Sequence, residues 1–213
     1  MRHPIQIQKD FTLQDNFAAL SLLRILKKGS YLFHQFERAT HYYCLKEGLM
    51  AIGCFGDDGT ENFTYFVGPG DYFGQEAISG GNRNSFALVL SQTAEIAVFD
   101  ARNWTDQSQR LRPLNDNWSK LLQRAQSTMI RNTAMNLADR IKKTLVEIGS
   151  LIGVRLLSGE ILIRTKLKHR EIAMLCCASR QSITTQLNEL IKAGYFIIDG
   201  NSILLREKLI NNQ

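Results

Sequence analysis

The sequence predicts an α+β protein whose front is rich in short antiparallel strands and whose back is helical and ends in a hairpin. Ten of the 15 glycines lie between Gly29 and Gly81, where short β-branched and aromatic runs alternate with turn residues. From Pro113 to about Ile148 the chain has no glycine, and apolar residues recur at spacings of three and four. The net charge is −2 over residues 1–104 and +8 over the remainder, which favours a nucleic-acid partner for the back.

The β-rich front is expected to hold six strands separated by turns. The expected strands cover residues 31–36, 42–46, 49–55, 62–67, 85–90 and 95–99. The segment Phe55–Thr60, with its Gly-Asp-Asp-Gly core, is typical of a hairpin loop. Many short strands at this spacing predict an antiparallel sandwich or barrel. A short amphipathic helix is expected before them, over about Phe17–Leu26.

A long helix is expected from about Pro113 to Asn132, with one apolar stripe. We expect this stripe to pair with the same helix of a second copy. The residues expected at that dimer interface are Trp118, Leu121, Leu122, Ala125 and Met129. A second stripe, from Leu137 to Ile148, predicts a further helix before Gly149 and Gly153.

The stretch from Lys168 to Ile191 predicts two short helices joined by a tight turn. Ser179 is a good N-cap for the second helix, which exposes polar side chains at its start. This is the arrangement by which a helix–turn–helix presents side chains to the DNA major groove. The segment Tyr195–Leu205 is two apolar runs around an Asp-Gly turn, which predicts a hairpin that fits a wing. An ordinary helical pair on a hairpin is the alternative. The cluster of five cations against Glu171 between Arg164 and Arg180 counts against it.

With these elements in order, the chain resembles the cyclic-AMP receptor protein/FNR family of bacterial transcription regulators. The motifs that carry the resemblance are Tyr42–Gly48, Gly68–Gly74, and Arg170-Glu-Ile-Ala followed by Ser179-Arg180. The resemblance implies an N-terminal β-roll of the cyclic-nucleotide-binding type (a double-stranded β-helix), a long dimerisation helix and a C-terminal winged helix–turn–helix. The implied domains are a sensor over residues 1–112, the dimerisation helix over 113–135 and the DNA-binding domain over 136–213.

The resemblance also implies which residues touch DNA. Arg180 stands where cyclic-AMP-receptor-like members place the arginine that reads guanine, and a guanidinium fork matches guanine O6 and N7. The residues expected to read bases are Arg180, Gln181, Thr184 and Thr185. Those expected to contact phosphates are His169, Arg170, Ser179, Ser182 and Asn201. Cys177 stands at a turn position that is often glycine in the family, and we expect slight strain there.

The candidate effector pocket departs from the family pattern. Its residues are Gly74, Gln75, Glu76, Arg83, Asn84, Ser85, Ser127 and Thr128. Family members that bind cyclic nucleotides neutralise the phosphate with an arginine, at a position that we assign to Asn84. Arg83 is one residue away and is expected to point to the other face of its strand, whereas Glu76 places a negative charge in the pocket. These features count against cyclic AMP and leave open another effector or none.

Other cofactor chemistry has little support in the sequence. The FNR branch holds an iron–sulfur cluster with an N-terminal cysteine cluster, and this chain has no cysteine before Cys44. Cys176 and Cys177 are too close together to clamp a metal, and packing is their expected role. His34 and His41 leave haem ligation open. No metal-ligand spacing and no nucleophile–base constellation is present, so no enzyme and no metal site is predicted.

The sequence therefore predicts an effector-responsive transcription regulator that acts as a homodimer on a pseudo-palindromic operator. Its expected partners are double-stranded DNA, a second copy and RNA polymerase. No apolar run approaches the roughly 18 residues of a membrane helix and the N-terminus is polar, so a cytoplasmic location is expected. The alternative is a cyclic-nucleotide-binding sensor module that signals to a protein partner through its basic tail.

Overall fold

The computed structural model describes residues 22–57, 59–103 and 108–210. They form two compact units divided at Thr128/Met129, within the helix α1 (Ser108–Ala134). We call the first the β unit and the second the winged unit, and each is described by itself. Within the described residues, no helix is both long enough and apolar enough to span a bilayer.

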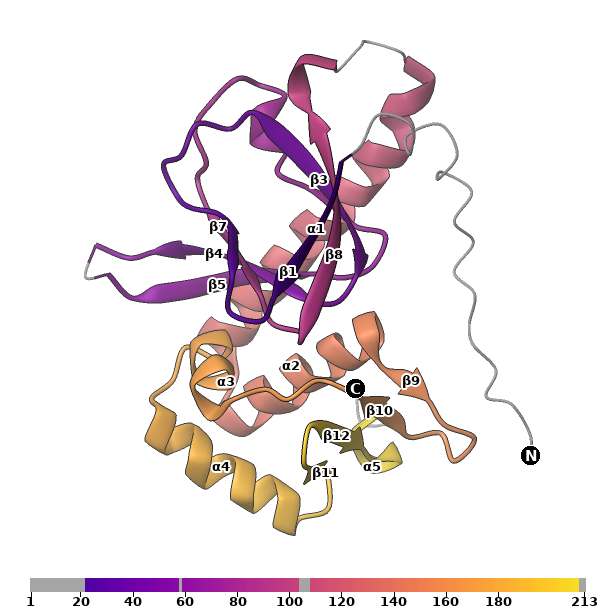
Figure 1. Cartoon of the computed structure of the whole chain (residues 1–213). Helices are drawn as coiled ribbons and strands as arrows, with labels where there is room; N and C mark the ends of the chain where they lie inside the picture. Colours follow the sequence, from indigo (N-terminus) through magenta and orange to yellow (C-terminus); the bar gives the residue numbers. More distant parts are fainter. Residues whose placement is uncertain (1–21, 58, 104–107, 211–213) are drawn as a thin grey trace. The chain divides into compact units, whose positions relative to one another are not determined.

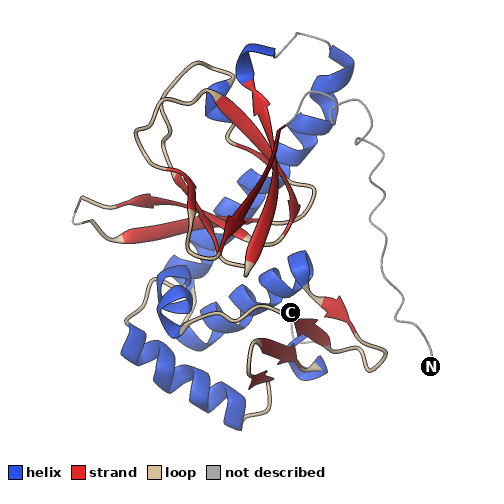
Figure 2. Ribbon diagram, in the orientation of Figure 1, coloured by secondary structure: helices blue, strands red, loops and turns tan. Residues whose placement is uncertain are grey.

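The β unit is built from two four-stranded antiparallel sheets (Figure 2). One sheet has the order β1-β8-β3-β6 and the other β2-β7-β4-β5. The strands are β1 (Leu22–Lys27), β2 (Tyr31–Phe33), β3 (His41–Glu47), β4 (Met50–Phe55), β5 (Glu61–Val67), β6 (Tyr72–Phe73), β7 (Phe86–Val89) and β8 (Thr93–Asp100). Apolar side chains of both sheets share one core, in which Leu45 and Ile96 of the first sheet join Met50 and Val89 of the second. Each of the six expected strands is present, with ends shifted by up to three residues.

The expected helix before these strands is wrong for its described part. Residues Leu22–Lys27 form the edge strand β1, which pairs antiparallel with β8 from Leu22↔Val98 to Lys27↔Thr93. Leu22, Leu23 and Ile25 are all exposed, and Leu26 is half-buried against the core, so the sequence of β1 lacks the alternation of a half-buried strand. The remainder of the predicted helix lies outside the described residues.

The helix α1 packs against the β unit through one of its faces (Figure 1). Leu121 is buried in the shared core and Leu114 in a second cluster, while Trp118 packs against both. Polar contacts add to this packing: Asn117 Oδ1 accepts the amide of Tyr72 at 2.9 Å, and Arg124 forms an ion pair with Asp71. The long helix was correctly predicted, but part of its apolar stripe serves its own domain.

The winged unit combines helices with a small sheet. Its elements are α2 (Leu137–Ile152), β9 (Val154–Arg155), β10 (Ile161–Ile163), α3 (His169–Leu175), α4 (Arg180–Lys192), β11 (Phe196–Asp199), β12 (Ser202–Leu205) and α5 (Glu207–Ile210). The sheet order is β11-β12-β10-β9. The helix α2 contacts α4 and β10, and Ile141, Leu145 and Ile148 on its apolar stripe are buried. The two short helices and the hairpin lie where the sequence predicted them.

Candidate nucleic-acid interface and effector pocket

The helix–turn–helix consists of α3, a turn and α4. Glu171 caps α3, because its carboxylate accepts the amide of Lys168 at 2.8 Å. Ser179 caps α4 as predicted: its hydroxyl accepts the amide of Ser182 at 3.0 Å and lies 2.8 Å from the Ser182 hydroxyl. The caps fix both helix starts, so the first turn of α4 is held in one orientation.

The turn between the helices requires a left-handed residue. Cys177 has φ 46°, in the region that favours glycine, which agrees with the expected strain at this position. The guanidinium of Arg140, on α2, donates to the carbonyl of Cys176 at 2.8 Å, and Asn132 Nδ2 lies 3.3 Å from the Cys177 sulfur. These contacts hold the turn in place despite the missing glycine.

The four residues predicted to read bases are not equally available on α4. Arg180, Gln181 and Thr185 are exposed, and the Arg180 side chain has no hydrogen bond or ion pair with another described residue. Thr184 is half-buried, and its hydroxyl lies 2.9 Å from Nδ1 of His169 and donates to the Arg180 carbonyl at 2.9 Å. The hydroxyl of Thr184 is therefore engaged within the protein, and three exposed side chains remain for base contacts.

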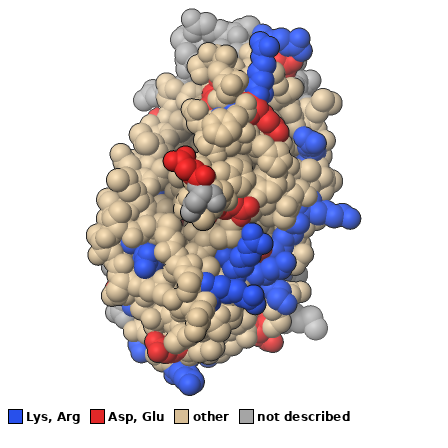
Figure 3. Space-filling model, turned by 90° about the vertical axis from the view of Figure 1, so that its left-hand side faces the viewer, with Lys and Arg blue, Asp and Glu red and all other residues tan. Residues whose placement is uncertain are grey.

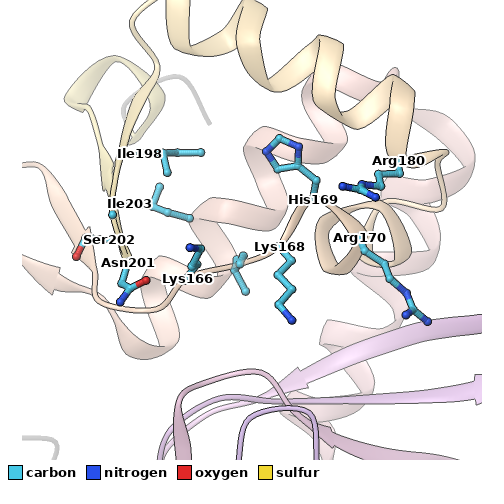
Figure 4. A pocket seen from close by; sticks show the side chains of 11 residues that line it. Lys166, Lys168, His169, Arg170, Arg180, Ile198, Asn201, Ser202 and Ile203 are labelled. Carbon is cyan, nitrogen blue, oxygen red and sulfur yellow. The ribbon is translucent and has the colours of Figure 1, made fainter.

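A groove of about 470 Å³ lies between the start of α3, the first turn of α4 and the β11–β12 hairpin (Figure 4). His169, Arg170 and Asn201, all predicted phosphate contacts, line this groove together with Arg180. Ser179 and Ser182 lie on the adjoining turn. The groove is also lined by Lys166, Lys168 and Ser202, which were not among the candidates. The alternation of cations from position 164 to 170 was the signal that could have identified the two lysines.

The distribution of charge on the surface agrees with the binding of a polyanion at this groove. Figure 3 shows a face of the molecule on which lysine and arginine side chains gather close together, whereas acidic side chains are scattered. Lys166, Lys168, Arg170 and Arg180 are all exposed. Clustered exposed cations attract phosphates without regard to sequence, while side chains on a protruding helix read bases.

In the β unit, Arg83 is the buried centre of a polar network. Its side chain is 2% exposed. Nη1 donates to the Gly74 carbonyl at 2.9 Å and to Glu76 Oε2 at 3.3 Å, and Nη2 donates to the His41 carbonyl. The guanidinium also lies 4.2 Å from the centroid of the Phe33 ring. The expectation that Arg83 points away from the pocket is wrong.

The error came from the position assigned to the loop before β7. Arg83 precedes β7, and its amide donates to the Glu37 carbonyl at 2.7 Å, so it pairs with the segment after β2. In this pairing the side chain of Arg83 faces inward and that of Asn84 is exposed. Neighbouring side chains point to opposite faces, as assumed, but the inward-facing residue is Arg83 and not Asn84.

Comparison with known proteins identifies the chain's relatives. A family model described as "Cyclic nucleotide-binding domain" matches residues 23–110. The chain is 27% identical over 191 residues to the CRP-like cAMP-activated global transcriptional regulator of Mycobacterium tuberculosis, covering 84% of this chain and 82% of the relative. It is 24% identical over 205 residues to the Anaerobic regulatory protein of Bacillus subtilis, covering 92% and 84%. A solved structure of a CRP-family transcriptional regulator from Thermus thermophilus has a TM-score of 0.76 at 23% identity, covering 88% of this chain and 95% of that one.

The front half of the chain matches a cyclic nucleotide-binding domain, and over most of its length the chain is similar to transcription regulators of the CRP/FNR family. The predicted resemblance to this family and the α+β fold are confirmed. Similarity to these regulators over most of the chain also favours the transcription-regulator interpretation over the sensor module that signals to a protein partner.

The residues predicted to line an effector pocket are only partly brought together. Gly74, Glu76 and Arg83 share the buried network, and the Ser85 hydroxyl donates to Glu76 Oε1 at 3.5 Å. The side-chain oxygen of Gln75 is buried without a hydrogen-bond partner among the described residues. Of the remaining candidates, Asn84 and Ser127 are exposed and Thr128 is buried on α1. In this arrangement the charge of Arg83 is already paired with that of Glu76.

The cysteines and histidines fall outside any metal-binding arrangement in the described part of the chain. No group of three histidine, cysteine or acidic side chains there is placed to hold a metal ion. Burial raises the pKa of the Cys44 thiol to about 11 and also raises the pKa of Cys176, so both stay protonated and pack as small apolar groups. His34 is exposed, and His41 lies with Nδ1 2.8 Å from the Thr40 hydroxyl.

Proposed function

We propose that the protein is a homodimeric regulator that binds a pseudo-palindromic operator through its two winged units. The observation that carries this proposal is Arg180, exposed on the capped first turn of α4 and bordering the basic groove. Residues 1–112 would serve as sensor, 113–135 as dimerisation helix and 136–213 as DNA-binding domain. Since its partners would be DNA and RNA polymerase, we assign the protein to the cytoplasm.

The division of contacts in the winged unit follows from exposure. Arg180, Gln181 and Thr185 would read base edges, and Thr184 would support them from within the protein. His169, Arg170 and Asn201 would contact phosphates along the groove, together with Lys166 and Lys168. Ser179 and Ser182 would offer hydroxyls and amides at the N-terminus of α4, where the helix dipole favours an anion.

The proposed dimer interface needs a correction within the predicted set. Leu121 is 3% exposed and Trp118 packs on the core of its own protomer, so neither is available to a partner. Leu122 is 61% exposed and Met129 is 70% exposed, and Ile130 adds a further exposed apolar side chain. The half-buried Ala125 lies between the two faces. We propose that Leu122, Met129 and Ile130 form the contact between the two α1 helices.

The proposal is tested by selecting genomic DNA fragments on the purified protein. We expect recovery of fragments that share an inverted repeat, with half-sites about one helical turn apart, as two-fold symmetry requires. The selection is repeated with Arg180→Ala, which keeps the fold because the side chain is exposed. Recovery of one shared motif by wild type and its loss in the variant supports the proposal, and fragments without a shared motif contradict it.

A further inference from the structure

A hollow of about 530 Å³ lies on the β unit, where β3 begins and β8 ends. These two strands lie side by side (Figure 1), and just beyond them the Ala101 amide donates to the Thr40 carbonyl at 3.0 Å. The short helix η2 (Gln75–Ala77) and the turn after it form the other side, where the Ala39 amide donates to the Gly81 carbonyl at 3.0 Å. Backbone hydrogen bonds thus join the segments around the hollow and fix its shape.

The charged groups at this hollow leave one arginine without an acidic partner. Arg102 is paired with Asp100, because its Nη2 lies 2.6 Å from Oδ2 and its Nε donates to both carboxylate oxygens at 3.0 and 3.1 Å. The hydrogen bonds from Arg102 lower the pKa of Asp100 to about 2, so this carboxylate stays ionised and the pair has no net charge. Arg38 also lines the hollow, and its exposed side chain has no hydrogen bond or ion pair with another described residue. The guanidinium of Arg38 is therefore available to a ligand.

The chemistry of the lining selects a class of ligand. A guanidinium binds a carboxylate through two parallel hydrogen bonds. Part of the lining is apolar, since Ala39 and Ala77 are buried there and Ala101 is half-buried. A volume of about 530 Å³ is within the range of small-molecule sites, in which a few polar groups orient a mostly apolar ligand. Because Asp100 lies at the same hollow as Arg38, a singly charged ligand fits better than a phosphate dianion.

We propose that this hollow binds an organic monocarboxylate, whose carboxylate pairs with Arg38 and whose apolar part packs on the alanines. The site shares no residue with the candidate effector pocket. It is nevertheless connected to Arg83, because the His41 carbonyl accepts from Nη2 of Arg83 and Ala77 ends the short helix that carries Glu76. A ligand in the hollow would therefore contact residues that hold the buried arginine. The inference goes beyond the proposed function and does not depend on DNA binding.

The experiment measures binding of two probes, benzoate and hexanoate, to the full-length protein by saturation-transfer NMR. We expect at least one of them to bind with a dissociation constant of about 1 mM or lower. The corresponding amides, benzamide and hexanamide, have nearly the same shape without the charge, and should bind at least about tenfold more weakly. Inorganic phosphate at the same concentration should not displace the carboxylate.

Three variants locate the bound probe. Arg38→Gln removes the charge at an exposed position and should weaken carboxylate binding at least about tenfold. Ala101→Leu keeps Arg38 but fills part of the hollow, and should also weaken binding. Arg24→Gln is the matched control, because it removes an exposed arginine of β1 that does not line the hollow, and should bind as wild type does. Circular dichroism verifies that each variant is folded.

Each other outcome decides against the site. Absence of binding of both probes at about 10 mM overturns the inference. Displacement by phosphate, or binding to Arg38→Gln as tight as to wild type, overturns it as well, because Arg38 would then not select a monocarboxylate. Equal weakening in Arg24→Gln would show that the probes respond to surface charge in general and not to the hollow. None of these results affects the proposed function, which the selection of DNA fragments tests separately.

Discussion

Arg83 in the β unit and Arg180 in the winged unit have opposite environments. In the β unit, Arg83 is enclosed and its guanidinium is used within the protein, by Glu76, two backbone carbonyls and the rings around it. In the winged unit, the Arg180 side chain is exposed and makes no hydrogen bond or ion pair with the rest of the described chain. A buried cation is stable only when its charge and donors are satisfied locally, whereas an exposed one is satisfied by water that a ligand displaces.

This contrast separates a structural arginine from one available to a ligand. An anionic effector would have to compete with Glu76, 3.3 Å from Arg83, and would enter a site that is already neutral. A guanine base or a phosphate would meet Arg180 with no competing acid described beside it. In the β unit the charge of Arg83 is thus neutralised within the protein, whereas in the winged unit the charge of Arg180 is available to a partner.

The largest expected effect comes from removing the enclosed cation. Arg83→Leu removes the buried cation paired with Glu76 and the donors that it offers to the Gly74 and His41 carbonyls, and should lower the unfolding free energy of the β unit by about 3–5 kcal/mol. Urea unfolding followed by tryptophan fluorescence measures this, since Trp118 packs on the core of this unit. Arg102→Ala removes an arginine that is 89% exposed in its pair with Asp100, and should leave the transition unchanged. Equal stability of both variants would remove the distinction between enclosed and exposed arginines.

A second prediction applies the same contrast to adjacent leucines of α1. Leu122→Glu should yield folded monomers with weaker DNA binding, because the side chain is exposed and would repel its copy in the proposed dimer. Leu121→Glu should instead unfold the β unit, because it buries a charge in the shared core. Sedimentation and circular dichroism separate the two results. A Leu122→Glu protein that stays dimeric at micromolar concentration would refute the interface.

The smallest expected effect concerns the turn before α4. Cys177→Gly should raise the stability of the winged unit by up to about 1 kcal/mol, because glycine adopts a positive φ without the strain of a Cβ. Cys177→Ala retains the Cβ and should give no gain. Thermal unfolding of the two variants measures the difference. Identical melting temperatures would show that the turn is unstrained.

The elements that could be predicted from the sequence are those that a local pattern of residues marks directly. The strands β3 to β5 and β8 were predicted well because turns and β-branched runs mark them directly. The helix α4 was predicted because Ser179 is both a good cap and an actual one. The strand β1 was missed because most of its apolar side chains are exposed, so they follow no alternation between a buried and an exposed face.

Two errors in the candidate sites have a common physical origin. Whether a helix stripe packs on its own domain or on a partner cannot be read from spacing, so Leu121 and Leu122 were placed together. Likewise, the inward face of the loop before β7 depends on its pairing with residues after β2, a long-range contact that places Arg83 inside. His169 and Thr184 were assigned to separate roles because their hydrogen bond joins two helices across the turn.

The most direct test of DNA reading by α4 is a titration of Arg180→Ala and Arg170→Ala against the selected operator, its single-base variants and several salt concentrations. Arg180→Ala should lose about 1–3 kcal/mol of binding per half-site and relax discrimination at one base pair, because a bidentate base contact is removed. Arg170→Ala, at the start of α3, should weaken all sequences alike and lower the salt slope by about one unit for each phosphate that the arginine neutralises. If Arg180→Ala kept full discrimination at every operator position, α4 would not be the helix that reads DNA.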